Sequence, residues 1–155
     1  MIIHKDFDVG RKFSNDIALM KLTEKLDLGV YMPACLIPRG SELVNINMTG
    51  SVYGWGRTDH IPHSALSNIL RFTSLTISSN NKCESLLDPL NENMICGLND
   101  GSSFCNGDSG GPMTVENDDG KHYLAGIVSF AELVEDAPCP IPVSEGSVLE
   151  FELAP

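Results

Sequence analysis

The sequence has few basic residues: 10 Lys and Arg stand against 21 Asp and Glu, so the 155-residue chain has a formal net charge of −11 at pH 7. A chain this acidic is poorly suited to bind nucleic acid or an anionic membrane surface, because both repel negative charge. Long apolar runs are also missing, since the most apolar segment, 124–134, is interrupted by Ser129 and Glu132 and is shorter than the ~18 residues of a membrane span. We therefore expect no nucleic acid and no membrane as partners.

The amino terminus lacks a recognisable signal peptide, because three apolar residues are followed at once by His, Lys and Asp. Cysteine is scarce and odd in number: there are five, so pairing would leave one over. Asn47-Met48-Thr49 is a glycosylation sequon, a triplet that also arises often by chance. We expect no metal and no cofactor.

The run Cys-Asn-Gly-Asp-Ser-Gly-Gly-Pro at 105–112 is the most informative part of the chain. A nucleophilic serine needs an exposed hydroxyl on a tight turn, small neighbours, and free N–H groups to receive the charge that develops on a carbonyl. Ser109, with Gly107 before it, meets these needs. The run could also be merely a polar turn, since Gly, Asp and Ser dominate turns.

The run also fits the G-x-S-x-G elbow of α/β-hydrolases, which must open into a helix. Here a short apolar segment at 113–115, the turn residues 117–120 and a second apolar run at 123–130 follow instead. This pattern predicts a β-hairpin and excludes the hydrolase elbow.

With a cysteine before it and a hairpin after it, the run resembles the nucleophile loop of chymotrypsin/trypsin-like serine peptidases. Three other segments resemble that family in the family's order. Asn-Asp-Ile-Ala-Leu-Met-Lys-Leu at 15–22 is similar to the segment that carries the triad aspartate, Cys-Leu-Ile-Pro at 35–38 to the inter-barrel linker, and Gly-Trp-Gly-Arg-Thr at 54–58 to the opening of the second barrel. The resemblance extends over residues 2–131.

The residues themselves indicate an all-β chain, with strands at 51–53, 70–77, 113–115 and 123–130 and a helical turn at 80–87 capped by Ser79 or Asn80. The resemblance implies an antiparallel double β-barrel, here most of the second barrel plus a remnant of the first. We expect a first-barrel remnant at 1–30, a linker at 31–50, the second barrel at 51–139 and a divergent acidic tail at 140–155. The ordinary interpretation of that tail, which lacks Lys and Arg, is a solvated end.

By the resemblance, Ser109 is the nucleophile, Asp16 is the triad aspartate, and the N–H groups of Gly107 and Ser109 form the oxyanion hole. Asp108 is then the partner of the ammonium group that zymogen activation frees. The implied substrate-binding residues are Ser103, Phe104, Asn106, Ser129, Phe130 and Ala131. A neutral Ser103 at the pocket floor favours apolar substrate side chains, and Phe104 and Ala131 would narrow the pocket toward medium-sized ones. Alternatively, Phe104 packs into the core.

A triad also needs a histidine, which the family places well upstream of the aspartate in a segment ending His-Cys. The fifteen residues before Asp16 contain no such segment, and we interpret His4, His60, His63 and His122 as solvated loop residues. The family's Ile/Val-Gly-Gly start and its closing strand and helix are not recognisable either. We therefore expect an incomplete chain that is inactive by itself.

The resemblance pairs Cys83 with Cys96 and Cys105 with Cys139, which leaves Cys35 unpaired and available to a disulfide-linked N-terminal segment. This cysteine pattern and the sequon at Asn47 favour a secreted, extracellular protein. The leading function is a serine-type endopeptidase that acts on peptides or proteins through a Ser109 acyl-enzyme. The alternatives are a non-catalytic homologue that serves as a secreted binding or regulatory module, and a truncated product without a stable fold.

Overall fold

The computed structural model describes residues 1–38, 41–59, 61, 64–83, 90–99, 101–131, 139 and 147–152. These residues form nearly all-β structure, which confirms the predicted fold class. The strands are β1 (Ile2–Ile3), β2 (Ala18–Leu19), β3 (Cys35–Leu36), β4 (Thr49–Gly54), β5 (Arg71–Ser78), β6 (Met94–Asn99), β7 (Pro112–Glu116), β8 (His122–Ala131) and β9 (Ser147–Glu152), with one helical turn, α1 (Asn80–Cys83). No helix in the described ranges is long and apolar enough to cross a membrane.

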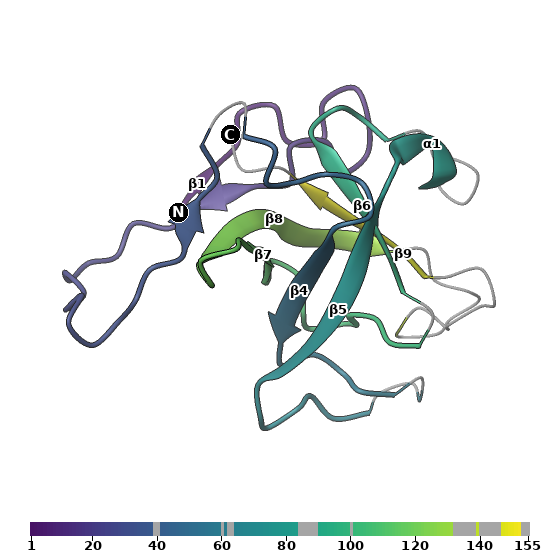
Figure 1. Ribbon diagram of the computed structural model, residues 1–155. Coiled ribbons are helices and arrows are strands. Elements are labelled where there is room, and N and C mark those ends of the chain that lie inside the picture. Colours follow the sequence, from purple (N-terminus) through teal and green to yellow (C-terminus); the bar gives the residue numbers. More distant parts are fainter. Residues whose placement is uncertain are drawn as a thin grey trace.

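The main sheet has seven strands in the order β3-β8-β7-β4-β5-β6-β9 (Figure 1). Strand β9 pairs antiparallel with β6 and also with β8, so six of the strands close into a ring. Strand β3 lies outside this ring and pairs in parallel with β8. The result is a small antiparallel barrel, the architecture in which strand edges are removed by closure.

The side-chain pattern of β4 and β5 explains why these segments pair. Residues 74–77 of β5 alternate in exposure: Ser74 and Thr76 are exposed, whereas Leu75 and Ile77 are buried. This is the alternation of a half-buried strand. In β4, Val52 is buried on the same side of the sheet. The barrel core contains Val52, Leu75, Ile77, Ile95, Phe104, Met113, Val115, Ala125 and Val128.

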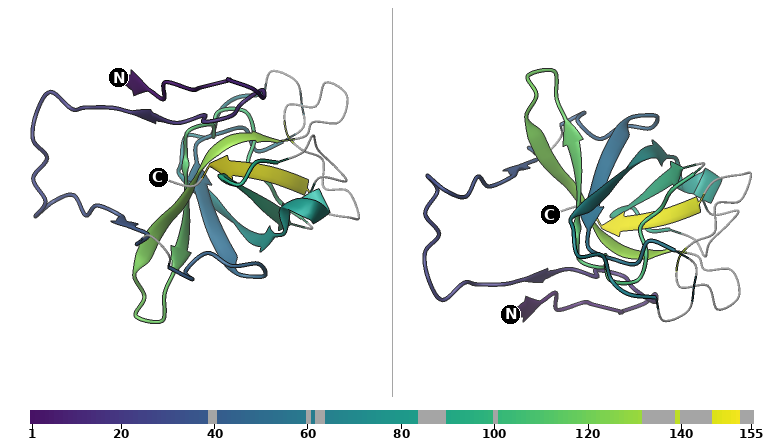
Figure 2. Two further views of the ribbon diagram at one scale, coloured as in Figure 1. Left: turned by 90° about the horizontal axis from the view of Figure 1, so that it is seen from above. Right: turned by 90° about the horizontal axis from the view of Figure 1, so that it is seen from below.

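The first 34 residues lie outside the main sheet. Strands β1 and β2 form a separate two-stranded antiparallel sheet, with Ile2 opposite Leu19. The chain then loops away from the barrel and returns to it at β3, as both views of Figure 2 show. Apolar side chains along this excursion are exposed, including Met20, Leu28 and Met32. Of the segment 17–22, which resembles the family's aspartate segment, only Ala18 and Leu19 form a strand.

The strands expected at 51–53, 70–77, 113–115 and 123–130 all form, within β4, β5, β7 and β8. The expected helical turn is present as α1, and Ser79 caps it, since its Oγ and carbonyl oxygen both accept from the N–H of Lys82. The rest of that prediction, residues 84–89, lies outside the described residues. Within the expected acidic tail, the backbone of residues 147–152 is part of the sheet as β9.

Candidate active site

The loop that carries Ser109 is a tight, internally bonded turn between Phe104 and β7. The N–H of Asp108 donates to the carbonyl of Cys105 at 3.0 Å, and the N–H of Gly111 donates to the carbonyl of Asp108 at 2.9 Å. Gly107 and Gly110 have φ values of +101° and +78°, the left-handed region that glycine enters without strain. These turns leave Ser109 exposed.

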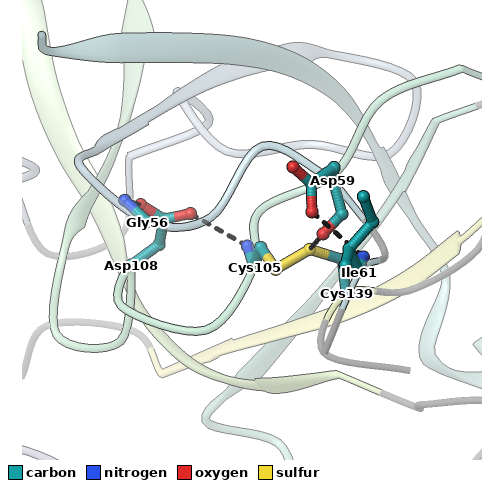
Figure 3. The surroundings of a disulfide bond; sticks show 6 residues. All are labelled: Gly56, Asp59, Ile61, Cys105, Asp108 and Cys139. Carbon is teal, nitrogen blue, oxygen red and sulfur yellow. Dashed lines mark hydrogen bonds between the residues drawn. A yellow bond between two sulfur atoms is a disulfide. The ribbon is translucent and has the colours of Figure 1, made fainter. Parts of the chain in front are cut away.

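The side chain of Asp108 turns away from solvent and fastens this loop to the segment after β4. Its carboxylate accepts from the N–H of Gly56 at 2.6 Å and from the N–H of Cys105 at 2.9 Å (Figure 3). A third bond runs from the N–H of Arg57 to the carbonyl of Asn106 at 3.0 Å. Because Asp108 and Ser109 are adjacent, fixing this carboxylate also fixes the serine backbone.

Glycine is required where Asp108 packs. A Cβ on Gly54 would overlap Oδ1 of Asp108 and lie 2.7 Å from its Cγ, and a Cβ on Gly56 would lie 2.6 Å from the same Oδ1. Both separations are too short for real carbon contacts. The Gly-Trp-Gly segment thus leaves room for the carboxylate behind the serine.

The N–H groups of Gly107 and Ser109 form no hydrogen bond with any other described residue. Only glycine fits at 107, because a Cβ there would combine the left-handed φ with a separation of 2.7 Å from Cδ2 of Leu66. Two amide donors beside an exposed serine hydroxyl can receive the charge of an oxyanion.

Asp16 is held by β8, although β8 lies more than a hundred residues later in the chain. The hydroxyl of Ser129 donates to Oδ2 of Asp16 at 2.7 Å, across 113 residues of sequence. Just before Asp16, Asn15 has a left-handed φ of +55°, and the N–H of Ile17 donates to the Asn15 carbonyl at 2.8 Å. This turn directs Asp16 toward Ser129. Sequence reasoning placed Ser129 in the substrate pocket and missed this bond, because no local pattern links the two residues.

The same part of β8 also holds the serine loop. The N–H of Gly110 donates to the carbonyl of Val128 at 2.8 Å, and the N–H of Val128 donates to the carbonyl of Gly111 at 2.9 Å. Val128 and Ser129 are adjacent, so one short stretch of strand anchors both the serine loop and the Asp16 carboxylate. The Ser109 loop and Asp16 are thus both attached to neighbouring residues of β8.

Neither described histidine is bonded to these two groups. The ring Nδ1 of His4 accepts from the N–H of Asp6 at 3.2 Å. The exposed His122 lies at the start of β8 with its Nδ1 3.4 Å from Oγ1 of Thr114. His60 and His63 lie outside the described residues.

Only two of the candidate substrate-binding residues line the cavity that the described residues form beside Asp108. A cavity of about 220 Å³ includes Ser103, Phe104 and Asp108 in its lining, together with Tyr53, Arg71 and Phe72, but not Asn106, Ser129, Phe130 or Ala131. The Oγ of Ser103 is buried and has no hydrogen-bond partner among the described residues. Phe104 is only 6% exposed and belongs to the barrel core, as the alternative interpretation of that residue held. The Phe130 ring packs on Phe13, with the centroids 4.9 Å apart.

Both implied disulfides form. Cys105–Cys139 joins the serine loop to a residue 34 positions later, and Figure 3 shows it beside Asp59, whose carbonyl oxygen is 3.0 Å from Sγ of Cys139. Cys83–Cys96 joins α1 to β6. Cys35, on β3, has an exposed free thiol.

The other ionisable side chains described give no further candidate for the chemistry. Among the described residues there is no group of three or more His, Cys, Asp or Glu side chains that could hold a metal ion. The hydrogen bond from the Lys5 ammonium lowers the pKa of the exposed Asp6 carboxyl. Asp6 forms no contact with Asp16 or Ser109 among the interactions described, so we assign it no part in the chemistry.

A closed antiparallel barrel, a serine on a glycine-rich loop stapled by a disulfide, and a distant carboxylate bound to the adjoining strand are features of the chymotrypsin/trypsin family. The chain belongs to the trypsin family, whose model, described as Trypsin, matches residues 1–144.

Curated relatives agree with this assignment. The chain is 34% identical to vitamin K-dependent protein C of Oryctolagus cuniculus over 142 residues, 33% identical to complement C1s subcomponent of Sus scrofa over 141, and 32% identical to serine proteinase stubble of Drosophila melanogaster over 137. These alignments cover 85%, 81% and 83% of the chain but 31%, 20% and 17% of the relatives. The chain thus spans less than a third of the length of each.

Proposed function

We propose that these residues are the serine-bearing part of a serine endopeptidase that cleaves peptide bonds through an acyl-enzyme on Ser109. The observation that carries the proposal is the common anchorage on β8, where Val128 binds the Ser109 loop and Ser129 binds Asp16. A binding module would need neither an exposed serine between glycines nor a carboxylate fixed near it.

In this mechanism the Oγ of Ser109 attacks the substrate carbonyl carbon while an imidazole removes the hydroxyl proton. The tetrahedral intermediate places its oxyanion on the N–H groups of Gly107 and Ser109. The imidazolium then protonates the leaving amine, the C–N bond breaks, and an acyl-Ser109 ester remains. Water hydrolyses this ester by the same steps, and Asp16 orients the imidazole throughout.

His4 and His122 are bonded elsewhere. His60 and His63 lie outside the described residues, and the sequence favours solvated loops for both, so in this proposal the imidazole comes from outside these 155 residues. We therefore expect the 155 residues by themselves to be inactive. In a related serine peptidase, loss of the histidine alone lowers turnover by about a million-fold. The oxyanion hole and substrate binding would retain only about 10³–10⁴ over water.

Three finer features complete the proposal. The neutral hydroxyl of Ser103 favours apolar substrate side chains, and Ala131 in place of a glycine would narrow the pocket. Asp108, which lines the 220 Å³ cavity, would accept a new terminal ammonium in addition to its two backbone donors. The exposed thiol of Cys35 would join a regulatory segment of the same secreted, extracellular protein.

A fluorophosphonate probe tests the proposal directly, because it phosphonylates only an activated serine. We expect the 155-residue chain to show no more labelling than its Ser109→Ala variant. The longest product of the gene that contains these residues should be labelled at Ser109 and should hydrolyse peptide esters, and both activities should disappear in Ser109→Ala. Asp16→Asn should lower its turnover by about 10⁴-fold.

Labelling of the 155-residue chain at Ser109 would contradict the requirement for an external histidine. A longer product that folds, binds peptides and remains unlabelled would instead support the non-catalytic homologue. Peptide mapping of the labelled serine separates Ser109 from adventitious sites.

A further inference from the structure

The turn before β4 presents an exposed asparagine, Asn47, at the surface. Asn47 is exposed, and its amide forms no hydrogen bond with any other described residue, although its backbone N–H donates to the carbonyl of Ile77 at 2.8 Å. By contrast, the side-chain amide of Asn45 donates to the carbonyl of Glu42, and that of Asn80 donates to two carbonyls. Asn47 is therefore an available amide on an ordered backbone.

The backbone at this position suits a bulky modification. Asn47 has a φ of +71°, and the N–H of Met48 closes a turn on the carbonyl of Asn45 at 3.1 Å. A residue at the apex of a surface turn directs its side chain into solvent. Thr49, which completes the Asn-x-Thr sequon, is exposed at the start of β4.

We propose that Asn47 carries an N-linked glycan. In this reaction the Asn47 amide nitrogen displaces a diphosphate from the anomeric carbon of a lipid-linked oligosaccharide, losing one proton and forming a C–N bond. Both reactants meet in the lumen of the secretory pathway, which is also where the Cys83–Cys96 and Cys105–Cys139 disulfides form. The inference is independent of whether Ser109 is active.

The position of the glycan is compatible with catalysis. Asn47 precedes β4, whereas Gly54 at the other end of β4 packs against the Asp108 carboxylate of the serine loop. A six-residue strand is about 20 Å long. The glycan would therefore lie at the end of β4 away from the serine loop and leave that loop uncovered.

The test is translation of the full chain behind a cleavable secretion signal in the presence of endoplasmic-reticulum microsomes. The translocated protein should show the mobility shift of one glycan, and peptide N-glycosidase should remove it while converting Asn47 to aspartate. Thr49→Ser keeps the sequon and should keep the shift. Thr49→Val keeps the β-branched shape of an exposed strand residue but lacks the hydroxyl, so it should abolish the shift.

These readouts do not depend on folding, because oligosaccharide transfer acts on the nascent chain. A translocated wild-type chain without a shift would overturn the proposal, and so would a shift that persists in Thr49→Val. A second measurement tests the placement on the folded protein. Peptide N-glycosidase should release the glycan from the native, disulfide-bonded chain as fast as from the unfolded chain, and resistance of the native chain would contradict an exposed turn.

Discussion

Replacing Gly54 by alanine should destabilise the barrel at the point where the serine loop is attached. The added Cβ would overlap the Asp108 carboxylate, so the carboxylate must move. The movement breaks the hydrogen bond that the overlapped Oδ1 accepts from the N–H of Gly56 at 2.6 Å. The chain can relieve the overlap only by giving up contacts that hold the loop.

The magnitude follows from these two costs. Forcing an extra carbon into a packed site costs about 1–3 kcal/mol, and losing a hydrogen bond to a charged group costs about 1.5–3 kcal/mol. Alanine also restricts the unfolded chain, which returns about 0.4–1 kcal/mol to the folded state. We expect the free energy of unfolding to fall by about 2–5 kcal/mol in Gly54→Ala, and by a similar amount in Gly56→Ala.

The chain supplies a matched control. A Cβ on Gly101 would meet nothing within 4 Å, and no left-handed φ opposes it. Gly101→Ala should therefore leave stability unchanged or raise it by about 0.4–1 kcal/mol. Urea unfolding of the oxidised chain, followed by far-ultraviolet circular dichroism, measures all three variants. Equal midpoints for Gly54→Ala and Gly101→Ala would refute the packing argument.

Three further outcomes follow from single contacts. In the complete enzyme, Ser129→Ala should lower kcat about tenfold or more with KM unchanged, because it removes a charge-assisted hydrogen bond to the triad carboxylate. An unchanged kcat would contradict this positioning role. Ser129→Thr, which keeps the hydroxyl, should retain activity. Replacing the Cys105–Cys139 pair by serines should cost about 4 kcal/mol in urea unfolding, as expected for a 34-residue separation. Leu75→Ala should lower the free energy of unfolding by about 2–5 kcal/mol, while the exposed Leu70→Ala should stay within about 0.5 kcal/mol, and similar losses in both would argue against the assigned core.

Several elements could be predicted from the sequence because their causes are local. The alternation of buried and exposed residues in β5 specifies a half-buried strand, and the turn residues 117–120 between β7 and β8 specify a hairpin. Gly107 and Gly110 predicted a tight loop around Ser109, and both adopt left-handed φ values. The resemblance supplied the disulfide pairs, which spacing alone leaves open.

Other features could not be predicted because their causes are distant in the chain. The strand at Ala18–Leu19 is short and exposed, and among the described strands it pairs with β1 alone, which a local apolar pattern cannot reveal. Phe104 packs in the barrel core among residues of several strands, a choice between core and substrate pocket that the sequence left open. The segment 147–152, part of the acidic tail that we expected to be a solvated end, pairs with both β6 and β8.

The sequence by itself determined the nucleophile loop, the family and most strand positions, since each depends on neighbouring residues. Only the tertiary structure decided that the Ser109 loop and Asp16 are attached to the same strand. That arrangement depends on Val128 and Ser129, adjacent residues of β8, which bind one group each. A strand presents its backbone and its side chains in different directions, so the two attachments coexist only once the barrel has brought both partners to that strand.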